Sequence, residues 1–134
     1  MKRAFVDNAG WYAFVRADDP DHDAIAAALT RWESRLVTSN FIFDEIVSLV
    51  WARLGHSAAK KVGETLRARE VVDSVRITAE DEEQAWKYLV RHKDKHYSFT
   101  DCTSFALMQR LGIEIAVTTD DHFRQAGYRM DPAL

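Results

Sequence analysis

Short apolar segments alternate with longer amphipathic segments along the whole chain, and this alternation limits the fold more than any other feature. Spacing and residue type predict strands over 3–6, 36–38, 71–77 and 113–118, with a further edge strand over 128–130. They predict helices over 21–33, 41–54, 57–68, 78–90 and 100–111, a short helix or turn over 8–16, and a last turn over 121–125. Strands that alternate with helices favour an α/β sandwich with a parallel sheet and right-handed crossovers.

Capping residues and glycines indicate where several of these helices begin and end. Asp19-Pro20-Asp21 is typical of a helix start, with an aspartate as the cap and proline in the first turn. Ser39 precedes the helix that Gly55 ends. Ser98 with Asp101 has the spacing of a capping box for the helix that Gly112 ends. The caps and the apolar spacing therefore predict the same division of the chain.

The composition favours a single domain over residues 1–134, because 47% hydrophobic and 29% charged side chains can form one core and its surface. Cys102 is the only cysteine, which excludes an intrachain disulfide framework and a zinc site built on several thiolates. No charge-free stretch approaches the ~20 residues that span a bilayer, and Asp7 interrupts the apolar segment that a signal peptide needs. We therefore expect a cytoplasmic protein without membrane contact.

Four acidic side chains fall where the predicted strands and helices meet. Asp7 directly follows the first strand, and Asp120 directly follows the fourth. Asp101 lies in the opening turn of a helix, and Glu45 lies about one turn into another helix, among apolar neighbours. Because ligands gather at the carboxyl ends of parallel strands, we expect the four carboxylates at one edge of the sheet or at helix N-termini nearby.

Each acid taken alone also has an ordinary structural interpretation. An aspartate after a strand is often a turn residue, and Asp101 by itself fits a helix cap better than a catalytic group. Glu45 is harder to explain in this way, because a carboxylate among apolar neighbours is costly unless it is paired. Only the four acids together indicate a functional site.

A cluster of carboxylates needs a cation, because like charges about 4 Å apart repel by ~1 kcal/mol in water and by more at lower dielectric. No lysine or arginine adjoins any of the four acids in the sequence. Hard oxygen ligands in an open site suit Mg²⁺ or Mn²⁺. Such an ion lowers the pKa of a bound water and stabilises charge on phosphate, so the predicted chemistry is phosphodiester hydrolysis.

Four segments around these acids resemble the motifs of the PIN-domain nucleases. Phe5-Val6-Asp7-Asn8-Ala9-Gly10-Trp11 is similar to the opening motif, and segment 38–47 is similar to the helix that carries the second acid. The most specific segment is 98–106, Ser-Phe-Thr-Asp-Cys-Thr-Ser-Phe-Ala, and segment 118–123 matches the terminal T-x-D-x-x-F signature. The motifs cover nearly the whole chain, and their order and the chain length resemble those of VapC-type toxins.

The resemblance implies a PIN-like three-layer α/β/α sandwich with a central, mainly parallel sheet of four to five strands. It implies a Mg²⁺-dependent endoribonuclease, with Mn²⁺ as an alternative ion and no protein nucleophile, so Cys102 is expected to pack. The acids implied to bind the metal are Asp7 and Asp101 directly, and Glu45 and Asp120 directly or through water. The residues expected to support them are Asn8, Ser98, Thr119 and Asp121. Asn8 stands where the family usually has Thr or Ser, and Asp121 is an alternative fifth acid.

The resemblance also implies three kinds of partner: RNA of the tRNA or rRNA class, a second copy of the chain, and an antitoxin whose tail covers the active-site cleft. The helices predicted over 41–54 and 57–68 are expected to form much of the antitoxin groove. Two groups of basic side chains are either solvated or bind RNA. The first group is Lys60, Lys61, Arg67 and Arg69, and the second is Arg91, Lys93 and Lys95. Four aromatic side chains have two interpretations: they pack in the core, or they stack on an unpaired base. They are Trp11, Tyr12, Trp51 and Tyr97.

Two alternatives to a ribonuclease stay open from the sequence alone. A haloacid-dehalogenase-like phosphatase would use Asp7 as its nucleophile, but such enzymes normally need a second aspartate two positions on, where Ala9 stands. A PIN-like binding module without activity would usually have lost one or more of the acids. The formal net charge of −3 does not argue against nucleic acid, because it would be +1 without the four proposed metal ligands.

Overall fold

A parallel β-sheet runs through the middle of the protein. The structure is a computed structural model that describes residues 1–133, and all strand pairs within them are parallel. The spatial order of the strands is β3-β2-β1-β4-β5. Their bounds are β1 Ala4–Val6, β2 Leu36–Ser39, β3 Asp73–Val75, β4 Ile115–Val117 and β5 Arg129–Asp131. The predicted parallel α/β architecture is confirmed, with the edge strand at the C-terminal end included.

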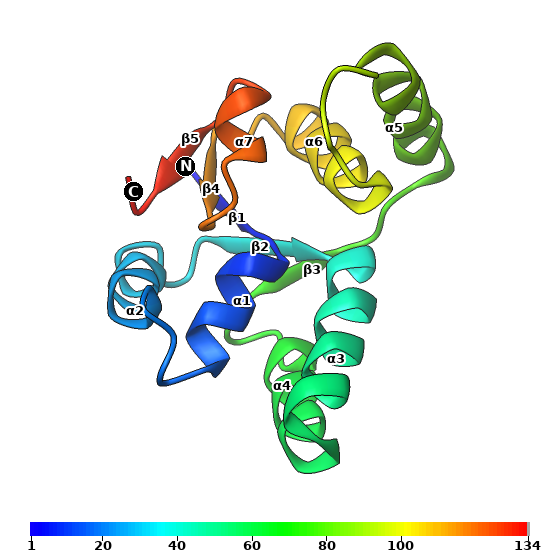
Figure 1. Ribbon diagram of the computed structural model, residues 1–134. Coiled ribbons are helices and arrows are strands. Elements are labelled where there is room, and N and C mark those ends of the chain that lie inside the picture. The colour runs from blue at the N-terminus through cyan, green and yellow to red at the C-terminus, as the bar shows by residue number, and fades with distance from the viewer. Residues whose placement is uncertain (134) are drawn as a thin grey trace.

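Helices cover both faces of this sheet, which makes three layers (Figure 1). Figure 1 shows α1 to α4 gathered on one side of the sheet, and α5 and α6 on the other. Helix α7 connects β4 to β5. The helix bounds are α1 Asn8–Val15, α2 His22–Arg31, α3 Asn40–Leu54, α4 His56–Arg67, α5 Ala79–Arg91, α6 Phe99–Leu111 and α7 His122–Gln125.

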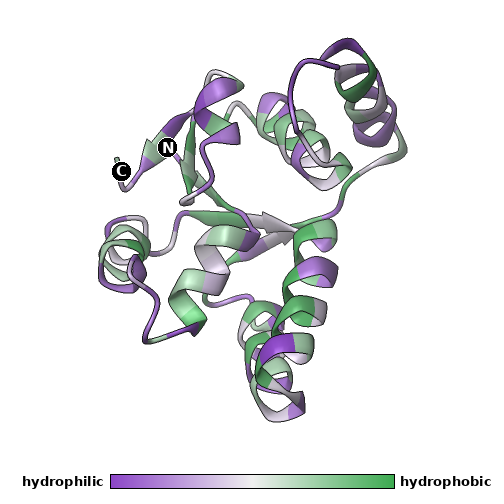
Figure 2. Cartoon of the chain, in the orientation of Figure 1, coloured by the Kyte–Doolittle hydropathy of each residue, from purple (hydrophilic) through white to green (hydrophobic). Residues whose placement is uncertain are grey.

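The core lies between the central strands and the inner faces of the helices. Every residue of β1 is fully buried, as expected for a strand that is covered on both faces. Figure 2 shows the same arrangement, with hydrophobic residues on the central strands and hydrophilic residues on the outer sides of the helices. No helix among the described residues is long and apolar enough to cross a membrane.

The strand order places the carboxyl ends of β1 and β4 next to each other. The chain moves from β1 outward to β2 and β3, and then returns to pair β4 with the other side of β1. Ligands of open α/β sheets bind where the strand order reverses in this way. Asp7 follows β1 and Thr118 follows β4, so polar residues of two distant segments meet at this point.

Helix α1 packs unusually close to the end of β4. A Cβ atom on Gly10 would lie 2.4 Å from the carbonyl oxygen of Val117, so only glycine permits this approach. Behind it, the indole of Trp11 donates a 3.3 Å hydrogen bond to the Thr38 hydroxyl, which donates to the Val6 carbonyl at 2.9 Å. These contacts fix β1, β2, β4 and α1 relative to one another.

Most predicted helix ends are confirmed, and two boundaries are wrong. Ser39 caps α3 by accepting from the Ile42 amide, and Gly55 and Gly112 end their helices with positive φ. Helix α2 begins at His22, one residue after the predicted start, but Asp19 is not its cap and Pro20 is not in its first turn. The Asp19 carboxylate instead accepts from the Asp21 amide and forms a turn before the helix. Strand β3 covers only 73–75 of the predicted 71–77, since its flanking residues do not pair with β2.

Candidate active site

Asp7 is a buried carboxylate at the carboxyl end of β1. It caps α1, where its Oδ1 accepts a 2.9 Å hydrogen bond from the Gly10 amide, and the residue is 4% exposed. Burial raises the pKa of Asp7 from 3.8 to about 7, despite hydrogen bonds from Gly10 and Thr118 that lower it. The negative charges of Asp120 and Asp101 raise this pKa further, so the three carboxylates lie close enough to repel one another.

Asp101 belongs to the first turn of α6 and is held there by a capping box. The Asp101 amide donates to the Ser98 hydroxyl at 2.9 Å, and the Ser98 amide donates to Asp101 Oδ2 at 3.1 Å. The predicted capping box is therefore confirmed. Burial and the charge of Asp120 raise the pKa of Asp101, although hydrogen bonds from Ser98 and His122 oppose this rise.

Asp120 reaches the same place from the turn that follows β4. Its amide donates a 2.9 Å hydrogen bond to the hydroxyl of Thr118, which is fully buried. Its Oδ1 accepts from the His122 amide at 2.9 Å, at the start of α7. The first hydrogen bond therefore fixes the backbone of the turn, and the second holds one oxygen of the carboxylate.

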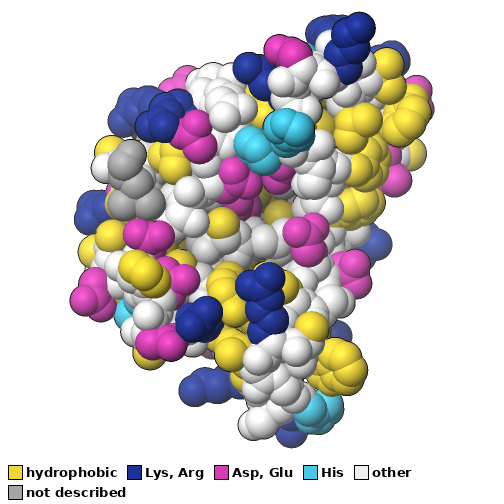
Figure 3. Space-filling view, in the orientation of Figure 1, with side chains coloured by type: hydrophobic (Ala, Val, Ile, Leu, Met, Phe, Trp, Pro, Cys, Tyr) yellow, Lys and Arg dark blue, Asp and Glu magenta, His cyan; other side chains and the backbone are white. Residues whose placement is uncertain are grey.

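His122 joins two of these acids through its ring. Its Nδ1 lies 3.0 Å from Asp101 Oδ2 and 3.4 Å from Asp120 Oδ1. Among residues 1–133 it is the only basic side chain within salt-bridge distance of any of the three aspartates, and it reaches Asp101 and Asp120 but not Asp7. Asp101, Asp120 and His122 together offer ligand atoms that lie within 4.8 Å of one another. Figure 3 shows acidic and histidine side chains adjoining at a hollow in the middle of the face.

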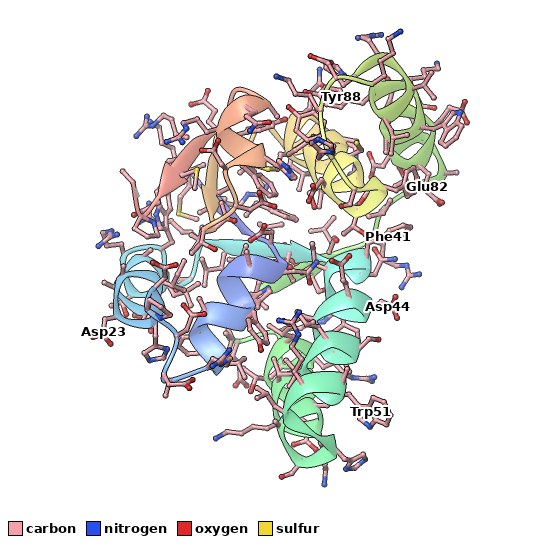
Figure 4. All side chains as sticks on the ribbon, in the orientation of Figure 1. Asp23, Phe41, Asp44, Trp51, Glu82 and Tyr88 are labelled. Atoms are coloured by element: carbon pink, nitrogen blue, oxygen red, sulfur yellow. The ribbon has the colours of Figure 1, made fainter. Side chains whose placement is uncertain are left out.

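Glu45 is not buried, although its neighbours in the sequence are apolar. A carboxylate enclosed by these neighbours would need a partner, but the residue is exposed on α3. The reason is helical geometry, since Ile42 and Ile46 face the core while Glu45 points about 100° away from Ile46. Its neighbour Asp44 projects outward from α3 (Figure 4).

The residues expected to support the acids have mixed positions. Ser98 supports Asp101 directly, as described above. Asp121 instead pairs with Arg124 and Gln125, so its carboxylate is already engaged on the surface of α7. The hydroxyl that contacts Asp120 belongs to Thr118 and not to Thr119. Asn8 follows Asp7 at the start of α1, and its side-chain oxygen is buried without a hydrogen-bond donor among the described residues.

Sequence reasoning missed three residues that shape this site: Gly10, Thr118 and His122. The signals were present, because Gly10 stands three residues after Asp7, where a capping carboxylate accepts from the backbone. Thr118 stands two residues before Asp120, the spacing at which a hydroxyl meets a backbone amide. His122 offered only its place beside the acids in sequence, and its link to Asp101, 21 residues away, requires the fold.

The donors of this site fit a hard divalent cation. Asp101 Oδ1 and Asp120 Oδ2 accept no hydrogen bond from any residue in 1–133, whereas the other oxygen of each carboxylate is held by the protein. The buried oxygen of Asn8 is a further unpaired acceptor nearby in sequence. Carboxylate and amide oxygens are the ligands that Mg²⁺ and Mn²⁺ prefer. Burial, together with the negative charges of Asp120 and Asp101, raises the pKa of Asp7 to about 7, and a cation bound beside it would oppose this rise.

Away from the acids, helices α1, α2 and α4 enclose an apolar groove of about 760 Å³. Its floor is lined by Trp11, Leu29, Val62 and Leu66 among others. Helix α4 lines this groove along much of its length, whereas α3 contributes only Leu54. The other lining residues belong to α1, α2, β2 and the segments that follow α2 and α4. Trp11 and Tyr97 are buried, so they pack in the core and do not stack a free base.

The PIN domain family matches residues 4–127 of this chain. The chain therefore belongs to the PIN domain family, as its motifs indicated. Within that family it is similar to the 23S rRNA-specific endonuclease VapC20 of Mycobacterium tuberculosis, with 40% identity over 127 residues that cover 92% of this chain and 94% of the relative. Ribonuclease VapC26 of the same organism is 25% identical over 115 residues, which cover 86% and 84% of the two chains.

Solved structures agree with this assignment. The crystal structure of Mycobacterium tuberculosis VapC20, a toxin that cleaves the sarcin–ricin loop, has a TM-score of 0.88 at 38% identity and covers 93% of this chain and 95% of its own. The DNA-bound VapBC of Salmonella typhimurium has a TM-score of 0.72 at 17% identity and covers 97% of both chains. The second likeness shows the fold alone, and both confirm the three-layer α/β/α architecture.

Proposed function

We propose that this protein is a metal-dependent endoribonuclease of the VapC type, the toxin of a toxin–antitoxin pair. One observation carries the proposal: Asp7, Asp101 and Asp120 converge from β1, α6 and the end of β4, where the strand order reverses. Membership in the PIN domain family supports it, and the 40% identity to an RNA endonuclease supports the choice of RNA.

The acids would hold Mg²⁺ or Mn²⁺, with Asp7 and Asp101 as direct ligands and Asp120 and Glu45 as ligands directly or through water. An ion held there would supply a water of lowered pKa and neutralise charge on the phosphate. The Gly10 amide and the capping box of α6 keep Asp7 and Asp101 in place before any ion arrives. Cys102 is fully buried, and burial raises the pKa of its thiol to about 11, so it is no nucleophile.

The substrate we propose is ribosomal RNA, with the sarcin–ricin loop of 23S rRNA as the first candidate. The support is the similarity to VapC20, which cleaves that loop. Arg91, Lys93 and Lys95 are exposed at the end of α5 and in the connection to α6, the helix that carries Asp101. Basic side chains there would bind phosphates near the acids, with an affinity that falls as salt rises.

The test is cleavage of a sarcin–ricin loop oligonucleotide by purified protein with Mg²⁺ or Mn²⁺. We expect a single cut by the parent, no cut in EDTA, and no cut by Asp7→Asn or Asp101→Asn. Asp44→Asn is the matched control, because Asp44 is exposed and projects away from α3. Glu45→Gln beside it tests whether Glu45 takes part.

Three results would contradict the proposal in different ways. Cleavage by both aspartate variants at the parent rate would exclude the acidic site. Metal binding without cleavage of any RNA would favour the inactive binding module. A phosphoaspartate trapped at Asp7 would revive the phosphatase, which the family assignment otherwise disfavours.

We further propose that the apolar groove between α1, α2 and α4 binds the antitoxin. An amphipathic helix fits such a groove through its apolar face, and Glu33, Lys61 and Glu70 at its edge would select the charges of the partner. Phe14 lines the groove and is 41% exposed, so Phe14→Glu can change the groove without opening the core. We expect this variant to lose co-purification with the protein encoded by the adjacent reading frame.

The homodimer is proposed on the exposed apolar side of α5. Trp86 and Val90 are more than half exposed and lie one helical turn apart. Figure 3 shows hydrophobic side chains gathered along the upper right edge of the molecule, where Figure 1 places α5 and α6. Analytical ultracentrifugation should find a dimer for the parent and a monomer for Trp86→Glu.

A further inference from the structure

We propose that His122 is a positioning residue that assembles the metal site, because its ring holds Asp101 while its backbone amide holds Asp120. The inference rests on the proposed metal-dependent function and adds a residue to it. His122 does not touch the ion in this proposal. It fixes which oxygen of each carboxylate is turned toward the ion and which is turned toward the protein.

The hydrogen bonds around Asp101 show this division of its oxygens. Asp101 Oδ2 accepts from the Ser98 amide at 3.1 Å and from His122 Nδ1 at 3.0 Å. Asp101 Oδ1 accepts from no residue in 1–133. A carboxylate with two donors on one oxygen cannot rotate freely, so its second oxygen is presented in a fixed direction.

The same histidine also orients Asp120, which lies two residues before it in the turn after β4. Asp120 Oδ1 accepts from the His122 amide at 2.9 Å and lies 3.4 Å from His122 Nδ1. Without the ring, Asp101 would be oriented by the capping box alone, and the contact that joins its carboxylate to the turn after β4 would be lost. His122 therefore sets the distance between two acids that lie on separate elements.

The packing around His122 explains why its ring holds one orientation. The next residue, Phe123, is fully buried and packs against Phe5 and Phe105, with ring centroids 6.4 and 5.1 Å away. Tyr97 meets the His122 ring edge to face at a centroid distance of 5.4 Å. Because Tyr97 is itself buried, one side of the imidazole lies against a fixed wall. These contacts favour the orientation in which Nδ1 faces the acids.

The position of Nδ1 argues against His122 as a metal ligand through that atom. A nitrogen that donates its proton to a carboxylate has no lone pair left for a cation. In many metal sites a polar group holds the ligand in this way without touching the metal, and its removal lowers metal affinity by roughly 10–100-fold. We expect the same loss when the His122 ring is removed.

The test is Mn²⁺ binding to the whole protein, measured by calorimetry and by pulsed electron paramagnetic resonance, on the parent and three variants. His122→Ala should bind Mn²⁺ roughly 10–100-fold more weakly than the parent. His122→Asn should recover most of this loss, because the asparagine amide can donate from nearly the place of Nδ1. His56→Ala is the matched control, since His56 is exposed at the start of α4, and it should bind as the parent does.

The outcomes separate this inference from the function on which it rests. If the parent itself binds no Mn²⁺, the metal-dependent function fails and the inference fails with it. If the parent binds and His122→Ala binds equally well, only the role of His122 is overturned. Coupling of a nitrogen nucleus to the bound Mn²⁺ in the parent, absent from His122→Ala, would make His122 a ligand and would also overturn the proposal. Circular dichroism melts show whether each variant is folded.

Discussion

Replacing Asp7 by asparagine should stabilise the metal-free protein while it abolishes cleavage. Asp7 is buried beside two other carboxylates, and this raises its pKa from 3.8 to about 7. A rise of this size corresponds to about 4 kcal/mol of stability lost once the group is ionised. The Asp7→Asn substitution removes the charge and keeps an oxygen that accepts from the Gly10 amide, so the capping hydrogen bond can persist.

The sign of the pH dependence follows from the direction of the pKa shift. Between about pH 4 and pH 7 the folded state binds more protons at Asp7 than the unfolded state does. The stability of the parent therefore falls as the pH rises through this range, and the full loss is present above pH 7. Urea denaturation in EDTA at pH 5 and pH 8 measures this loss of stability. Asp7→Asn is the variant in which position 7 cannot ionise.

The comparison between parent and variant isolates Asp7 from the other titrating groups. At pH 8 in EDTA, Asp7→Asn should be more stable than the parent by a few kcal/mol, and the gap should shrink at pH 5. Saturating Mg²⁺ should narrow the gap at pH 8 by stabilising the parent alone, by about 2.7 kcal/mol at 100 times the Kd. A variant that is less stable than the parent at pH 8 in EDTA would refute the idea of an uncompensated buried charge.

Three further changes test other parts of the structure. Gly10→Ala places a Cβ 2.4 Å from the Val117 carbonyl oxygen. Compared with the parent, it should lower the free energy of unfolding by about 1–3 kcal/mol in urea denaturation and slow cleavage of the oligonucleotide. Arg110→Met leaves the buried Asp81 carboxylate without its guanidinium, 2.8 Å away, and should lower the midpoint of urea unfolding by the equivalent of about 1–3 kcal/mol. Cys102→Ala should cut RNA at the parent rate in the oligonucleotide assay, and a large loss would implicate the thiol.

The fold could be predicted from the sequence because its signals are local. Apolar spacing located the helices, and the cap residues Ser39 and Ser98 with Gly55 and Gly112 gave most of their ends. The start of α2 was misplaced because an aspartate before a helix can cap it or form a turn, and the sequence is the same for both. Asp19 forms the turn.

The positions of the acids could be predicted only where the carboxylate stands at the end of a strand or the start of a helix, because those ends can be read from the sequence. Asp7, Asp101 and Asp120 meet this condition, since each stands at the end of a strand or the start of a helix. Glu45 does not, because its exposure depends on which face of α3 packs against the sheet. The link between His122 and Asp101 depends on how α7 lies against α6, which no local pattern encodes.

The arrangement of hydrogen bonds explains how three like charges are kept together without a permanent countercharge. Asp7, Asp101 and Asp120 each have one oxygen bound to a backbone amide from their own segment, at Gly10, Ser98 and His122. These donors belong to helix starts, where amides lack partners within the helix and favour negative charge. The fold thus supplies partial positive charge from the backbone at each acid, and the electrostatic strain that remains is concentrated on Asp7, the most buried of the three. A divalent cation held by these acids would relieve this strain, so metal binding would at the same time stabilise the fold.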